Sequence, residues 1–134
     1  MRVKAQPVRL HVGNTTKNPL VAHRERHNMR DLNAVAVWPD GGIYEITMAD
    51  TLESFQGLVG GCVQCVFGEE HVIYVNEEGL LQSLPFNRRA TEFANRFVAK
   101  GHLLYGVAVI VGPADSEGNN TNVHPDVASQ CVKL

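Results

Sequence analysis

The sequence lacks any long apolar stretch. No segment of its 134 residues approaches the roughly 20 consecutive apolar residues that a helix needs to span a bilayer. The N-terminus carries basic residues but no continuous apolar run, so we expect no signal peptide. These absences predict a cytoplasmic protein with no membrane partner. The length is that of one domain, and a hydrophobic fraction of 44% is enough to build one core.

Cysteine is also scarce, and an odd number of three predicts no disulfide framework. Cys62 and Cys65 have the spacing of a redox or zinc pair, but a zinc site normally needs further ligands nearby. The pair falls in an expected strand, where residues three apart point to opposite faces. His23 and His27 could share a helix face and hold a metal if a third ligand came from elsewhere, such as His11, His71, His102 or His124. We expect no metal and no cofactor.

The chain has none of the common catalytic motifs. It contains no nucleophile elbow, no Walker A loop and no dinucleotide fingerprint. Gly60 and Gly61 follow an expected helix, whereas phosphate-binding loops precede one. This favours a non-enzymatic protein without deciding the question, because catalytic triads are spatial and cannot be read from spacing.

Charge is unevenly spread along the chain. Residues 1–33 carry seven Lys or Arg and two acidic residues, a net charge of +5, and the remainder has a net charge of −7. A basic arm on an acidic body can indicate contact with nucleic acid. This arm has no aromatic residue for stacking and no DNA-binding motif, so we expect no nucleic-acid partner.

Hydrophobic periodicity and turn residues predict the element order β-β-α-β-β-α-β. The expected strands are 34–38, 43–48, 62–67, 71–75 and 103–111, with 8–12 as a further edge strand. The expected helices are 51–59, capped by Asp50 or Thr51 and ended by Gly60, and 88–99, capped by Asn87. Their core positions are Leu52, Phe55, Leu58, Phe93 and Phe97.

This order predicts an α+β fold: a single small domain whose sheet is mostly antiparallel, with two helices packed on one face. The expected boundaries are a basic, irregular arm (1–32), the core domain (33–112) and a polar tail (113–134).

Two short motifs predict a ligand site. The NEEG segment, residues 76–79, predicts a type I turn, and its amide and carboxylates could read a base edge or a ribose. Asn87 caps a helix whose N-terminus would attract an anion, and Arg88 and Arg89 lie in that first turn, where positive charge opposes the helix dipole. The arginines indicate either an anionic ligand or pairing with the acidic turn. The candidate ligand-binding residues are Gln56, Asn76, Glu77, Asn87 and Arg88.

The motifs LESFQGLVGG, NEEG and LPFNR, followed by the strand YGVAVIVG, resemble a domain-of-unknown-function family, number 3846, of phages and mobile elements. The resemblance runs from about Val35 to Gly112. It implies an accessory protein of a phage or integrative element that acts in the host bacterial cytoplasm.

The leading hypothesis is a non-enzymatic phage accessory protein that binds and sequesters a small nucleotide-type ligand. A host immune signal is a candidate ligand, which would make the protein an anti-defence sponge, and a homo-oligomer is expected to complete the pocket. One alternative is an interaction module or antirestriction-type inhibitor that presents its acidic surface to a host defence protein. A further alternative is a nucleotide-processing enzyme with Glu77 or Glu78 as general base.

Overall fold

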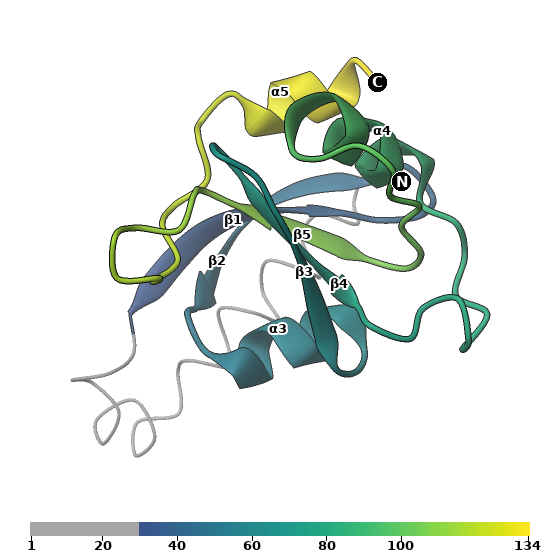
Figure 1. The fold of residues 1–134 in the computed structure, drawn as a ribbon, viewed down its shortest axis with the longest axis horizontal. Coiled ribbons are helices and arrows are strands. Elements are labelled where there is room, and N and C mark those ends of the chain that lie inside the picture. Colours follow the sequence, from purple (N-terminus) through teal and green to yellow (C-terminus); the bar gives the residue numbers. More distant parts are fainter. Residues whose placement is uncertain (1–29) are drawn as a thin grey trace.

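The structure, a computed structural model, describes residues 30–134 (Figure 1). The predicted elements follow one another in the predicted order, with one further helix at the C-terminus: β1 (Asp31–Val37), β2 (Ile43–Ala49), α3 (Leu52–Val59), β3 (Val63–Phe67), β4 (Val72–Asn76), α4 (Arg88–Phe97), β5 (Ala108–Val111) and α5 (Val127–Val132). The predicted strand at 8–12 and the pair His23 and His27 lie outside the described residues. Within residues 30–134, none of the helices has the length and apolar character needed to cross a membrane.

The strands of residues 30–134 form one sheet in the order β2-β1-β5-β4-β3, and every neighbouring pair is antiparallel. The last strand, β5, is inserted between two earlier ones, so that Ile110 lies opposite Val35 of β1 and opposite Ile73 of β4. Strands β2 and β3 are therefore the two edges. The α+β class and the antiparallel sheet are confirmed.

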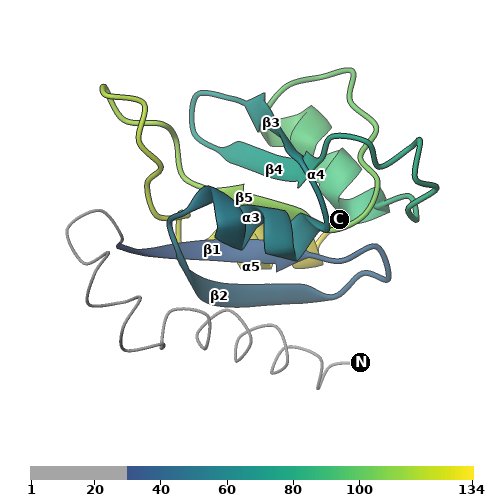
Figure 2. The ribbon, with the colours of Figure 1, turned by 90° about the horizontal axis from the view of Figure 1, so that it is seen from below.

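Both faces of the sheet are covered by helices. Val109 of β5 shares a core cluster with Phe55 of α3, whereas the next residue, Ile110, shares the opposite cluster with Phe93 of α4. Figures 1 and 2 show α3 on one side of the sheet and α4 with α5 on the other. The prediction that both helices pack on one face is wrong. All four residues of β5 are fully buried, which is the pattern of a strand covered on both sides.

The helix ends follow their capping residues. The Thr51 hydroxyl accepts a hydrogen bond from the Ser54 N–H at 3.2 Å, and the Asn87 side chain accepts one from the Ala90 N–H at 3.1 Å. Gly60 ends α3 in the left-handed conformation, with φ of +83°, which glycine adopts without steric cost. The predicted caps at Thr51 and Asn87 and the stop at Gly60 are confirmed.

Two core predictions and one strand boundary are wrong. Leu52 and Phe97 are 55% and 40% exposed, because each is the terminal residue of its helix. Strand β5 begins at Ala108, not at residue 103, since Gly106 takes a φ of +82° that interrupts extended backbone.

The C-terminal segment belongs to the folded domain. Residues 113–134 were expected to form a polar tail, yet Val127 and Cys131 of α5 are 0% exposed and lie in the same core cluster as Phe93. The domain core therefore extends beyond residue 112. At the other end, β1 begins at Asp31, inside the expected arm.

A candidate ligand-binding hollow beside His71

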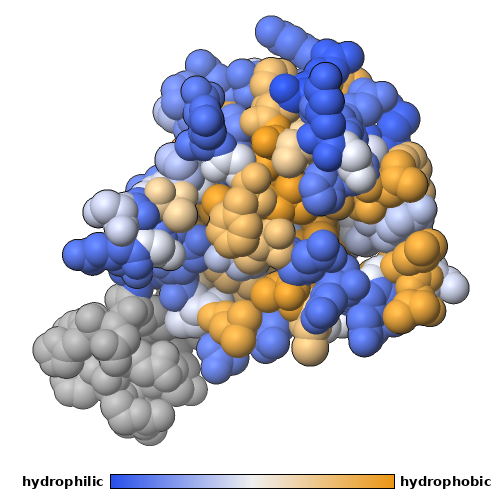
Figure 3. All heavy atoms as spheres, viewed as in Figure 1, coloured by the Kyte–Doolittle hydropathy of each residue, from blue (hydrophilic) through white to orange (hydrophobic). Residues whose placement is uncertain are grey.

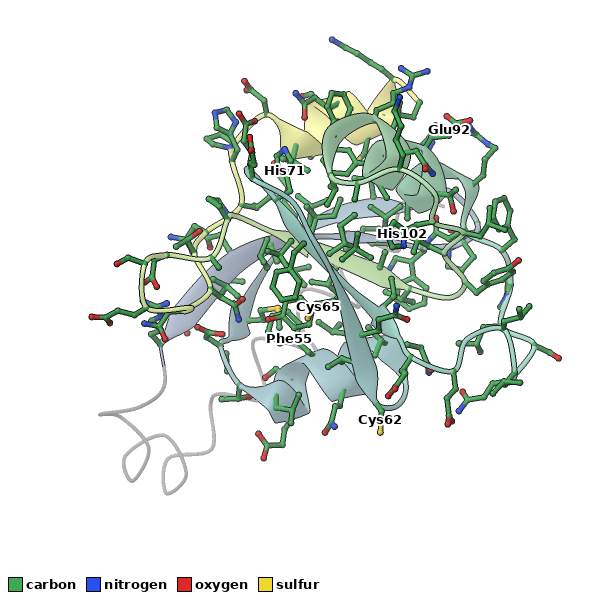
Figure 4. The ribbon with its side chains drawn as sticks, in the orientation of Figure 1. Phe55, Cys62, Cys65, His71, Glu92 and His102 are labelled. Carbon is green, nitrogen blue, oxygen red and sulfur yellow. The ribbon has the colours of Figure 1, made fainter. Side chains whose placement is uncertain are left out.

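A hollow of about 650 Å³ opens between the β3–β4 turn and the C-terminal segment. Three separate parts of the chain line it: Glu70 and His71 from the turn, Pro113 with residues 122–125, and Gln130 from α5. Figure 4 shows His71 at the end of the β3–β4 hairpin that faces α5.

Hydrogen bonds to the sheet fix the wall made by residues 122–125. The Asn33 N–H of β1 donates to Asn122 Oδ1 at 2.8 Å, and the Val123 N–H donates back to the Asn33 carbonyl at 2.9 Å. Gly112 follows β5 and begins the segment that leads to this wall, and a Cβ at Gly112 would collide with the carbonyl oxygen of Asn122. The wall is therefore anchored to β1 on one side and to the end of β5 on the other.

His71 is the most deeply buried polar residue of the hollow. The residue is only 6% exposed, and its Nδ1 has no hydrogen-bond partner within residues 30–134. The ring meets Phe93 edge-on, with centroids 5.1 Å apart. Burial lowers the pKa of His71, against the opposing effect of Glu70 and with a smaller contribution from His124. The imidazole is therefore neutral at pH 7, with one nitrogen that donates and one that accepts.

Gln130 supplies a second unpaired polar atom. It is half-buried, and its Oε1 also lacks a hydrogen-bond partner in the described part of the chain. An unpaired buried polar atom costs about 1–3 kcal/mol, so native proteins rarely keep one without a reason. Pro113, Val123 and Pro125 add apolar wall to the same hollow. Together these groups suit a small, flat, uncharged ring that carries hydrogen-bonding groups on its edge.

A second hollow, of about 710 Å³, adjoins the same turn and is lined by residues 67–70 and 95–100. Its amide, Asn95, is already used by the fold. Nδ2 donates to the carbonyls of Thr91 at 2.7 Å and His102 at 3.0 Å, while Oδ1 accepts the Gly101 N–H at 2.7 Å. None of the buried unpaired atoms of residues 30–134 lines this hollow, so it is the weaker candidate.

The structure does not bring the five predicted site residues together. The amide of Asn76 stabilises the fold on the α3 side, where Nδ2 donates to the Val59 carbonyl at 3.2 Å and Oδ1 accepts the Glu78 N–H at 2.7 Å. Glu77 is exposed beside it, and Gln56 is half-buried on α3. The NEEG segment forms the predicted turn, and its asparagine is engaged in holding that turn.

Asn87 lies on the other side of the sheet and is 0% exposed. Besides capping α4, its Nδ2 donates to the carbonyls of Val37 at 2.9 Å and Gly106 at 2.8 Å. The side chain therefore ties the start of α4 to the end of β1 and to the approach to β5, and its hydrogen-bonding groups are occupied.

The two arginines do not pair with the NEEG turn. Arg88 forms an ion pair with Glu92 at 3.1 Å and donates to the Leu134 carbonyl at 3.3 Å. Arg89 donates to the Gly41 carbonyl at 2.9 Å. Local contacts therefore account for both charges, and the hypothesis that they pair with the acidic turn is wrong.

The cysteines of the described chain are all free. Cys62 is exposed and Cys65 is half-buried, and burial raises the pKa of the Cys65 thiol. Burial also raises the pKa of Cys131 to about 12. Within residues 30–134, no three His, Cys, Asp or Glu side chains gather as a metal site. The thiols of Cys65 and Cys131 are therefore poor nucleophiles at neutral pH.

Sequence reasoning missed the two central residues of the hollow. The sequence pattern offers His71 only as a third metal ligand and gives no role to Gln130. The one available signal was a histidine placed directly before the apolar run VIYV, where it was bound to be buried. Gln130 gave no such signal, because its place beside His71 depends on how the C-terminal segment packs.

One comparison with known proteins gives a match. The model of a family described as domain of unknown function (DUF3846) matches residues 29–134. The match includes the C-terminal segment that forms one wall of the hollow. No protein of curated function and no solved structure matches the chain.

Proposed function

This chain belongs to the family described as domain of unknown function (DUF3846), and we propose that it is a non-enzymatic protein that binds and sequesters a small nucleotide-type ligand. The base of the ligand enters the hollow between His71 and Gln130. This assigns the ligand to a different place from the NEEG and LPFN motifs, whose two asparagines the fold already uses.

The observation that carries the proposal is that two residues lining one hollow, His71 and Gln130, each hold a buried polar atom, Nδ1 and Oε1, with no hydrogen-bond partner in residues 30–134. A nucleobase carries donors and acceptors side by side on a flat ring. A neutral imidazole can donate or accept at Nδ1, and an amide oxygen accepts. Once both side chains turn these atoms towards the hollow, the base would satisfy both of them and would pack its faces on Pro113, Val123 and Pro125.

Charge supports recognition through the base and not through phosphate. Among residues 30–134, Glu70 is the only formally charged residue that lines the hollow, and it repels an anion. His124 is exposed and sits 3.8 Å from the Asp126 carboxylate. The phosphate groups of a bound nucleotide would therefore point out of the hollow into solvent.

Sequestration needs tight binding and no chemical step. The raised pKa values of the Cys65 and Cys131 thiols agree with this. The family resemblance supports a setting in a phage or mobile element, inside the host bacterium. In that setting the ligand would be a host immune signal, and the protein would act as an anti-defence sponge.

Calorimetric titration of the full-length protein tests the proposal. Adenosine, guanosine, cytidine and uridine and their monophosphates are titrated separately, and at least one base is expected to bind. His71→Phe and Gln130→Leu should each weaken that binding about tenfold, the effect of one lost hydrogen bond. The matched control is Arg88→Ala, which removes a residue of the sequence-predicted site and should leave the affinity unchanged.

Two results would overturn the proposal. A folded wild type that binds no base or nucleotide would favour the acidic-surface inhibitor instead. Binding that is lost in Arg88→Ala but kept in His71→Phe would return the site to the start of α4.

A further inference from the structure

Within residues 30–134, strand β3 has a row of backbone groups without partners at the edge of the sheet. In this part of the chain it pairs only with β4. The Glu77 N–H bonds to the Cys62 carbonyl at 2.8 Å at one end, and the Gly68 N–H bonds to the His71 carbonyl at 2.9 Å at the other. Because hydrogen-bonded pairs alternate in an antiparallel ladder, the even-numbered residues of β3 bond to β4. The N–H and C=O groups of residues 63, 65 and 67 therefore point away from the sheet.

This edge carries none of the features that usually prevent edge strands from pairing. Such features are charged side chains, proline and bulges, and the sequence VQCVF has none of them. The opposite edge, β2, carries the exposed Glu45. Phe67 is 65% exposed at the end of β3, and Figure 3 shows hydrophobic residues along the middle of the face that β3 crosses in Figure 1.

We propose that β3 pairs antiparallel with β3 of a second copy of this chain, about a two-fold axis at Cys65. In this register Cys65 lies opposite its own counterpart, and Val63 lies opposite Phe67 of the second copy. The two sheets become one continuous sheet. The inference is independent of the proposed ligand, because none of these three residues lines the His71 hollow.

The register satisfies every unpaired group of the edge. Residues 63, 65 and 67 would all occupy hydrogen-bonded positions, since their backbone groups already point outward. Val63 would cover the exposed ring of Phe67, and no two like charges would meet within the strand. The two-fold axis is perpendicular to the sheet. It therefore places α3 of both copies on one face of the continuous sheet, and α4 and α5 of both copies on the other.

The oligomeric state of the full-length protein is the first test. Light scattering after size exclusion should give twice the 14.7 kDa mass of one chain. Cys65→Pro removes an N–H that makes no bond within the copy, so the variant should remain folded and become monomeric. Cys65→Val is the matched control and should stay dimeric, because it keeps the backbone N–H and a small apolar side chain opposite its counterpart.

Phe67→Lys gives a second variant that does not depend on proline being tolerated. The residue is mostly exposed in a single copy, so the fold should be kept while the charge breaks the contact with Val63 of the second copy. Gln64→Pro should instead destabilise the fold, since its N–H bonds to β4.

Amide hydrogen exchange locates the interface. In wild type the amides of residues 63, 65 and 67 should exchange slowly, and in Phe67→Lys they should exchange fast while those of 64 and 66 stay protected. A wild type that is monomeric at every concentration would overturn the proposal. Slow exchange of these amides in such a monomer would mean that another part of the same chain covers the edge. A dimer that persists in both Cys65→Pro and Phe67→Lys would also overturn it.

Discussion

Replacing His71 by Phe should stabilise the unliganded protein while it removes a ligand contact. His71 is only 6% exposed, and within residues 30–134 its Nδ1 has no hydrogen-bond partner. Phenylalanine keeps a ring in edge-to-face contact with Phe93 and buries no polar atom. The adjoining hollow of about 650 Å³ has room for the slightly larger ring.

The expected gain follows from the group removed. Leaving a buried polar group unpaired costs about 1–3 kcal/mol, and the aromatic contact with Phe93 is retained. We therefore expect the free energy of unfolding to rise by about 1–2 kcal/mol. With a urea dependence of about 1–3 kcal/mol per molar, the unfolding midpoint should rise by roughly 0.3–2 M.

The same variant should change the pH dependence of stability. Burial lowers the pKa of folded His71 below its ordinary value of 6.5, so below that pH the unfolded chain binds this proton more readily than the folded one. Wild-type stability should be full above about pH 6.5 and fall as the pH drops from there towards the folded pKa. His71→Phe lacks this loss, so its advantage should grow between pH 7 and pH 5.

Urea unfolding followed by circular dichroism at pH 7 and pH 5 measures both effects. His124→Phe is the control: that side chain is 62% exposed, and its replacement should change stability by no more than about 0.5 kcal/mol. If His71→Phe is less stable than wild type at both pH values, then His71 makes a stabilising interaction in the fold and the hollow loses its main argument.

Three further predictions test the fold. Phe93→Ala should cost about 3–5 kcal/mol in urea unfolding, and Phe97→Ala, from the exposed end of the same helix, clearly less; equal losses would contradict the core assignment. Asn87→Ala removes three hydrogen bonds and should lower the thermal midpoint more than any surface substitution, so an unchanged midpoint would show that the buried amide is dispensable. Replacing Cys62 by Ala together with Cys65 by Val should alter stability only modestly, and stoichiometric zinc that is lost in this double variant would refute the view that the thiols are inert.

From the sequence one could predict that polar side chains would form a candidate ligand site, but not which residues would form it. Polar residues at turns and helix starts are the natural candidates for a ligand site, and that reasoning selected Asn76 and Asn87. Both amides are used instead to close a turn and to join a helix to two strands, because buried polar groups must find partners within the fold. His71 and Gln130, far apart in the chain, could not be paired from spacing.

The sequence by itself determined the order of the first seven elements, where both predicted helices begin and where α3 ends. Asn87 and Thr51 cap helices and Gly60 ends one because each satisfies backbone groups within a few residues, so the physics is local. The tertiary structure decided the rest: the insertion of β5 between β1 and β4, the helices on opposite faces, and the hollow at His71. These depend on contacts between distant segments, and the uniformly apolar AVIV run of β5 fits a strand buried on both faces without saying which helix covers which.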